Sequence, residues 1–282
     1  MPMEEKQRFA IGKDNFGYTA MHQEVGILFF LYVSHRPVRP TFISSSLDRS
    51  TQKIGDFKES YQVGKFKNGK PVHPLPTLFE ERVDELESFM KSCHTVISKI
   101  LQTFAIGLEI PESEGGKNWL SDRHAYDIPS GDVLRILHYP AVESRDVDDI
   151  RAGSHTDYGS VTLLFQHNIG GLEVHAGRSR WIPAPVLPGC AIINLGDCLE
   201  YWTNGLFKST RHRVVFRSDT QKLERYSLVY FCQGYEGVSL DPIPSSLVPH
   251  DEKEEEAGRP LTAVEHLRMK LDASYEYYAN EE

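Results

Sequence analysis

The sequence predicts an α+β fold that is mainly β, in which a double-stranded β-helix (jelly roll) core is flanked by helices. Three observations predict it. One long segment of helical period lies in the first half of the chain, many short apolar or alternating segments follow it, and Gly, Pro and Asn residues separate those segments. Many short strands after a helical segment are typical of a double-sheet barrel or jelly roll.

Composition and charge describe an ordinary globular chain. The 282 residues are 40% hydrophobic and 25% charged, and the net charge of -9 argues against a general nucleic-acid or anionic-membrane surface. Four cysteines form no CxxC pair, which favours reduced thiols in a cytosolic protein. The most apolar run, residues 26–33, is too short to span a bilayer and lacks a signal-peptide cleavage pattern. We therefore expect a cytoplasmic protein without membrane or nucleic-acid partners.

A long helix is predicted after an irregular N-terminal segment at residues 1–76, which is rich in Gly, Pro and Ser. Thr77 and Glu80 have the spacing of a capping box, and the first turn is acidic. Apolar residues then recur at steps of three and four up to Phe104, and Gly107 follows as a stop signal. We expect this helix to be a structural support.

The second part of the chain, residues 77–282, is predicted to form one domain of helix plus jelly roll, closed by a C-terminal helix. The last helix is expected from Leu261 to about Tyr278. The strands are predicted from short runs rich in β-branched and aromatic residues. They lie at residues 132–140, 160–166, 172–175, 191–196, 210–216 and 225–233.

A metal site is predicted from His155, Asp157 and the distant His212. Two imidazoles and one carboxylate with open coordination positions are the ligand set of non-haem Fe(II) oxygenases. On an extended segment, residues i and i+2 point to the same side, so His155 and Asp157 can hold one ion together. Taken alone, a His-x-Asp pair among twelve histidines indicates a polar loop. The order in which these residues occur, followed by Arg225-Tyr226-Ser227, favours the metal site.

A carboxylate site is predicted beside the metal. Arg225 and Ser227 are two apart on a predicted strand and face the same way, and Tyr139 ends another strand. A guanidinium directed into a barrel requires an anionic partner, and a dicarboxylate such as 2-oxoglutarate could chelate the metal with its other end. The alternative is an exposed strand arginine, which would be preferred without the metal triad.

These motifs together resemble the 2-oxoglutarate- and Fe(II)-dependent oxygenases related to isopenicillin N synthase, which include small-molecule oxygenases of plants and fungi. The matching stretches are LRILHYP (134–140), SHTDYGSVTLL (154–164), GGLEV (170–174), Trp181, PGCAIINLGDCLEYWTNGLFKSTRHRVV (188–215) and RYSLVYF (225–231). The resemblance implies that His155, Asp157 and His212 are the iron ligands. It also implies that Arg225 and Ser227, with Tyr139 as an additional donor, hold the distal carboxylate of 2-oxoglutarate.

The activity implied by the resemblance is the hydroxylation or desaturation of a small organic substrate. Dioxygen and 2-oxoglutarate would be consumed, succinate and carbon dioxide would be the co-products, and ascorbate would support the iron. Two alternatives stay open: an Fe(II) oxidase of the same fold that does not use 2-oxoglutarate, and a truncated relative without catalysis. The substrate and the oligomeric state are not indicated by the sequence.

Three departures from the family pattern accompany the resemblance. Family members usually carry several dozen residues ahead of Met1, so the N-terminal section is expected to be truncated and an edge of the sheet uncovered. An apolar stretch near residues 25–46 is interpreted as an insertion. Leu137 stands where an Asn is common, and the interval from His212 to Arg225 is slightly long. The last departure weakens only the role assigned to Tyr139.

Overall fold

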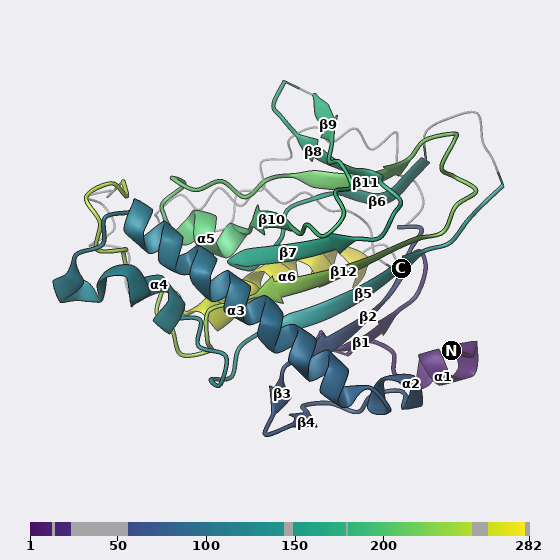
Figure 1. Cartoon of the computed structure of the whole chain (residues 1–282), viewed down its shortest axis with the longest axis horizontal. Helices are drawn as coiled ribbons and strands as arrows, with labels where there is room; N and C mark the ends of the chain where they lie inside the picture. Colours follow the sequence, from purple (N-terminus) through teal and green to yellow (C-terminus); the bar gives the residue numbers. More distant parts are fainter. Residues whose placement is uncertain (13–14, 24–55, 144–148, 179, 250–258, 280–282) are drawn as a thin grey trace.

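Two antiparallel sheets and one long helix make up most of the architecture (Figure 1). The structure is a computed structural model that describes residues 1–282 except 13–14, 24–55, 144–148, 179, 250–258 and 280–282. The helices are α1 (Met3–Arg8), α2 (Thr77–Glu80), α3 (Val83–Gly107), α4 (Trp119–Asp122), α5 (Asp197–Trp202) and α6 (Ala263–Ala279). The strands are β1 (Gly17–Thr19), β2 (Glu59–Gly64), β3 (Phe66–Lys67), β4 (Lys70–Pro71), β5 (Val133–Tyr139), β6 (Asp149–His155), β7 (Val161–Gln166), β8 (Leu172–His175), β9 (Trp181–Pro183), β10 (Ile192–Leu195), β11 (His212–Phe216) and β12 (Arg225–Cys232).

The predicted jelly roll is confirmed by the sheet topology. The larger sheet has the order β1-β2-β5-β12-β7-β10, and the smaller one has the order β6-β11-β8-β9. All six strands predicted from short apolar or alternating runs are present. Strands β6 and β9 were not expected, and the four strands β1 to β4 occupy the N-terminal segment for which irregular structure was expected. The suspected insertion near residues 25–46 lies outside the described residues.

Helix α3 lies across the outer face of the larger sheet, as the apolar stripe predicts (Figure 1). Its buried side chains include Met90, Ile97 and Leu101, which pack in the same core as residues of β5, β7 and β12. The helix begins later than predicted. The turn α2 is a separate element, Pro76 is its N-cap residue, and no side-chain capping bond forms there. The predicted capping box at Thr77 is therefore wrong.

The inner face of the larger sheet lines a cavity. Along β12, Arg225, Ser227, Val229 and Phe231 point into this cavity. Tyr230, between them in sequence, packs in the core beneath α3. This period of two explains how one strand serves both the hydrophobic core and the cavity wall.

The C-terminal helix α6 closes the same cavity at one side, since Leu267 and Leu271 line it. A capping box starts this helix: Glu265 Oε2 accepts the N–H of Thr262 (2.8 Å), and Thr262 Oγ1 accepts the N–H of Glu265 (3.3 Å). Lys270 forms an ion pair with Asp197 at the start of α5 (2.8 Å). Within the described part of the chain, no helix is long and apolar enough to cross a membrane.

Candidate metal centre and 2-oxoglutarate pocket

The three predicted metal ligands come together in the wall of the cavity. His155 ends β6 and His212 begins β11, where the two residues are cross-strand partners with ring centroids 4.3 Å apart. His212 Nε2 lies 3.7 Å from Asp157 Oδ1. One ligand atom from each of the three residues falls within 4.8 Å of the others. One detail differs from expectation: within the His155–Asp157 pair only His155 is on a strand, because Asp157 lies in the loop that follows β6.

Backbone carbonyls orient both imidazoles. His155 Nδ1 is 2.8 Å from the carbonyl oxygen of Gly153, and His212 Nδ1 is 3.0 Å from that of Thr210. A carbonyl oxygen can only accept, so each Nδ1 carries a proton and each Nε2 is the ring nitrogen left to face a metal ion. Burial, followed by the nearby charge of His212, lowers the pKa of His155 to about 4. This imidazole is therefore neutral near pH 7, as a metal ligand must be.

The carboxylate of Asp157 is buried and held by two donors. Its Oδ2 accepts a hydrogen bond from Thr162 Oγ1 (2.8 Å) and another from Asn194 Nδ2 (2.6 Å). Burial acts to raise the pKa of Asp157, but His212 and His155, together with these two donors, outweigh it and the pKa is lowered. The carboxylate therefore stays ionised, and its other oxygen is directed at His212.

Sequence reasoning missed Thr162 and Asn194. They are cross-strand partners in β7 and β10. Their separation in sequence hides this pairing, although both lie within the stretches that carry the family resemblance. Asp197, the first residue of α5, also contacts this region. Gly196 is the N-cap residue of α5, and the Asp197 carboxylate binds Thr156 (3.2 Å) and Lys270 (2.8 Å).

The donor set fits a divalent transition-metal ion. Two imidazole nitrogens and one ionised carboxylate leave open positions in an octahedral shell, as in the facial triad of non-haem Fe(II) sites. The three residues also face the same cavity, which has a volume of about 430 Å³. That volume leaves room for further ligands beside the ion.

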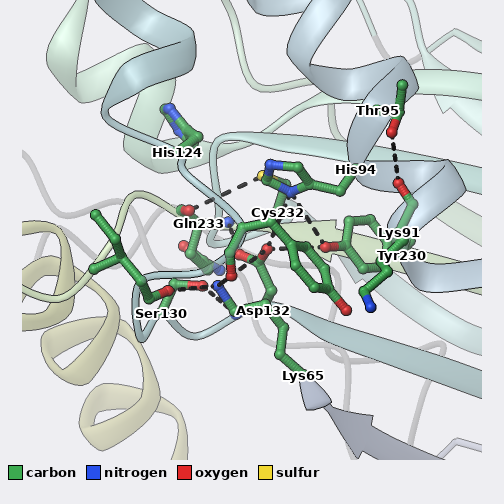
Figure 2. Close-up of polar contacts among 12 residues, drawn as sticks. Lys65, Lys91, His94, Thr95, His124, Ser130, Asp132, Tyr230, Cys232 and Gln233 are labelled. Atoms are coloured by element: carbon green, nitrogen blue, oxygen red, sulfur yellow. Dashed lines mark hydrogen bonds and ion pairs between the residues drawn. The ribbon is translucent and has the colours of Figure 1, made fainter. Parts of the chain in front are cut away.

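A second group of possible ligands, His94, Asp132 and Cys232, lies on the other face of the sheet. Figure 2 shows Asp132 among His94, Lys65, Tyr230 and Gln233. Asp132 accepts hydrogen bonds from the hydroxyl of Tyr230 (2.9 Å) and the N–H of Gln233 (2.7 Å), and the Lys65 ammonium is 4.0 Å away. Burial raises the pKa of the Cys232 thiol well above its ordinary value. The carboxylate of Asp132 is already hydrogen-bonded, the Lys65 cation lies beside it, and the Cys232 thiol is protonated. We therefore interpret this cluster as a buried polar contact and not as a metal site.

Arg225 lies inside the cavity, as predicted. It is 1% exposed, and its guanidinium sits over the ring of Tyr139 with 4.9 Å to the centroid. Its described hydrogen-bond partners are neutral: Ser227 Oγ and Gln166 Oε1, each at 3.3 Å. Nε has no partner among the described residues. Burial lowers the pKa of Arg225, against a raising contribution from Tyr139. The guanidinium therefore has donors available for an anion.

Strand register explains why Arg225, Ser227 and Tyr139 come together. Arg225 and Tyr139 are cross-strand partners in β12 and β5. Ser227 follows Arg225 on the same face of β12. Gln166 on β7, which is the cross-strand partner of Ser227, is the member that sequence reasoning missed. A buried cation with two neutral neighbours and free donors fits one carboxylate of a dicarboxylate.

Known proteins are similar to this chain in sequence and in fold. The sequence model of the 2OG-Fe(II) oxygenase superfamily matches residues 130–234. The UPF0676 protein C1494.01 of Schizosaccharomyces pombe is 32% identical over 99% of this chain and 78% of its own length. The 2-oxoglutarate-dependent dioxygenase htyE of Aspergillus rugulosus is 31% identical over 80% of this chain and 69% of its own length.

Solved structures agree with these relatives. A full-length Neurospora crassa protein in complex with alpha-KG (2-oxoglutarate) superposes with a TM-score of 0.70 and 28% identity, over 96% of this chain and 77% of that one. A structure of the same protein with alpha-KG and thymine gives a TM-score of 0.70, 26% identity, and coverage of 98% and 80%. The chain therefore belongs to the 2OG-Fe(II) oxygenase superfamily and is an Fe(II)- and 2-oxoglutarate-dependent oxidoreductase of the dioxygenase type.

Proposed function

We propose that His155, Asp157 and His212 bind one Fe(II) ion. Arg225, Ser227 and Tyr139 bind the distal carboxylate of 2-oxoglutarate beside it. The observation that carries this proposal is the joint placement, in one cavity, of three converging ligand atoms and a buried guanidinium without an anionic partner among the described residues. The bound iron supplies the activation of dioxygen that couples decarboxylation of 2-oxoglutarate to oxidation of a C–H bond.

The residues of the chain supply geometry and exclude competing reactions. Thr162 and Asn194 fix one oxygen of Asp157, so the other is available to the ion. The carbonyls of Gly153 and Thr210 keep the Nδ1 protons of the two histidines in place. Arg225 orients the co-substrate through charge-assisted hydrogen bonds. Apolar side chains from both sheets, including Leu164 and Val214, line the rest of this region and limit access of water.

The proposed substrate is a small organic molecule bound on the far side of the metal from Arg225. Thr162, which holds Asp157, is the cross-strand partner of Phe231 on β12. Along β12, Arg225 is six residues before Phe231, so it lies to one side of Thr162 and Asp157. The cavity continues on the other side toward Leu267 and Leu271 of α6. The volume of about 430 Å³ suits a small substrate, and the thymine complex of the Neurospora protein supports one of that size. Hydroxylation and desaturation are both compatible with this arrangement.

The proposal is tested by titrating 2-oxoglutarate into the anaerobic Fe(II) protein. Chelation should produce a visible charge-transfer band, and the variants His212→Ala and Arg225→Met should each weaken or abolish it. Aerobic turnover with ascorbate and labelled 2-oxoglutarate should then release succinate, and a substrate should increase the rate. A protein that binds Fe(II) without this band would instead support an oxidase of the same fold that does not use 2-oxoglutarate.

A further inference from the structure

We propose that Asp56 positions His155 for metal binding by holding a β-bulge in β6. Asp56 precedes β2 and lies outside residues 130–234, the range matched by the family model. The inference deepens the proposed function and rests on it, since His155 is taken as a metal ligand. Three structural observations support it: the register of β6, the hydrogen bonds of Gly153, and the burial of Asp56.

The register of β6 contains one extra residue next to His155. His155 pairs with His212, but the next paired residues are Ala152 and Val214, so three steps on β6 oppose two on β11. In a regular strand, residues three apart face opposite sides of the sheet. Ala152 and His155 nevertheless both line the cavity. The bulge therefore allows His155 to face the metal site, which is a known use of β-bulges next to active sites.

Asp56 binds the backbone at the centre of this bulge. Its Oδ1 accepts the N–H of Gly153 at 2.8 Å, and both groups are buried. The carbonyl of the same Gly153 accepts the Nδ1 proton of His155 at 2.8 Å. The residue that Asp56 fixes is therefore the residue that orients the imidazole.

The hydrogen bond between Asp56 and Gly153 is buried, so its loss would not be replaced by water. Asp56 is 4% exposed, and its second oxygen contacts the ammonium of Lys58, which is also buried. A bulge leaves a backbone group without its ladder partner, and a buried N–H without an acceptor destabilises the local conformation. Without the carboxylate, the peptide that carries the Gly153 N–H would be free to reorient, and the next peptide, whose carbonyl holds His155 Nδ1, would lose its fixed neighbour. Partners that orient metal ligands commonly change metal affinity by about 10- to 100-fold.

Three substitutions separate position from charge. Asp56→Asn keeps an acceptor oxygen in place and removes the charge. Asp56→Glu keeps the charge and displaces the oxygens by one methylene group. Asp56→Ala removes both. Asp132→Asn is the matched control, because it alters another buried carboxylate that accepts a backbone N–H, beside the larger sheet and away from β6.

The probe is Co(II) alone, added to the whole chain, with affinity measured from its visible absorption. In the Co(II) protein, the Nδ1–H protons of His155 and His212 should appear as separate paramagnetically shifted NMR signals. We expect Asp56→Ala and Asp56→Glu to weaken Co(II) binding by about 10- to 100-fold, with a smaller loss for Asp56→Asn. In the Asp56→Ala and Asp56→Glu proteins, the His155 Nδ1–H signal should shift, or broaden because its proton exchanges with water. The His212 signal, whose acceptor is Thr210, should be unchanged and serves as an internal control.

Other results would overturn the inference. Lower thermal stability with unchanged Co(II) affinity and an unchanged His155 signal would mean that Asp56 acts only in folding. A greater loss for Asp56→Asn than for Asp56→Glu would assign the effect to charge rather than position. If Asp56→Ala does not fold, the relative Co(II) affinities of Asp56→Asn and Asp56→Glu still decide between position and charge. Failure of the unsubstituted protein to bind Co(II) would instead contradict the proposed function itself.

Discussion

Replacing Arg225 with Met should weaken 2-oxoglutarate binding strongly while leaving the ligand-free protein at least as stable as before. The two effects have different signs because the guanidinium is buried and its described partners, Ser227 and Gln166, are neutral. A buried charge without a counterion is unfavourable in the ligand-free fold, and Met fills a similar volume without that charge. The same charge is the main attraction for a carboxylate.

The size of the loss follows from the hydrogen bonds available. Hydrogen bonds to charged groups contribute about 1.5–3 kcal/mol each. A carboxylate held by two donors of Arg225 would therefore lose about 3–6 kcal/mol, which corresponds to about a 10²- to 10⁴-fold weaker affinity. Ser227 and Tyr139 would remain and retain part of the binding.

The assay is an anaerobic titration of the Fe(II) protein with 2-oxoglutarate, followed by the visible charge-transfer band, with thermal melting of the metal-free protein in parallel. Arg123→Met is the matched control, since Arg123 also stacks on an aromatic ring, that of Trp119 at 3.7 Å. It should lower stability without changing 2-oxoglutarate affinity. Unchanged 2-oxoglutarate affinity in Arg225→Met would refute the assignment of Arg225. A large drop in its melting temperature would refute the argument about its unpaired charge.

Three further predictions follow from individual contacts. Asn194→Ala removes a donor to Asp157 (2.6 Å) and should weaken Co(II) binding by about 10- to 100-fold, measured by visible absorption. Thr262→Ala removes the capping bond to Glu265 and should lower the free energy of unfolding by about 1 kcal/mol in urea. Burial, and secondarily a nearby lysine, lowers the pKa of His266 to about 4. As the pH falls below about 6.5, His266 is therefore protonated in the unfolded chain before it is protonated in the folded protein, and the free energy of unfolding decreases. His266→Gln should remove about 2 kcal/mol of the loss between pH 7 and pH 5, and an unchanged pH profile would contradict the assignment.

The strands that could be predicted from the sequence are those with a clear alternation of apolar side chains. Strand β6 could not, because its sequence DIRAGSH has no such pattern. The bulge next to His155 breaks the period of two, and Arg151 is fully buried in spite of its charge. Strand β2 was missed for a related reason: Ser60 and Gln62 are polar but buried. Binary patterning predicts strands that face a hydrophobic core better than strands that face a polar cavity.

The site shows a similar division. The placement of His155, Asp157, His212 and Arg225 in one cavity could be predicted because their chemistry is specific and their spacing resembles a known family. The residues that hold them in place, Asn194 among them, depend on strand register and bulges. These features bring together side chains that are distant in the sequence, and no local pattern indicates them.

The most direct test of the account is to locate iron in crystals grown anaerobically with Fe(II) and 2-oxoglutarate. Anomalous scattering at the iron edge should give one peak in the cavity, at about 2.0–2.2 Å from His155, Asp157 and His212. Density for a diacid should extend from that peak to the guanidinium of Arg225. An iron peak at the His94–Asp132–Cys232 cluster, or no peak at either place with the cavity open to solvent, would contradict the central claim.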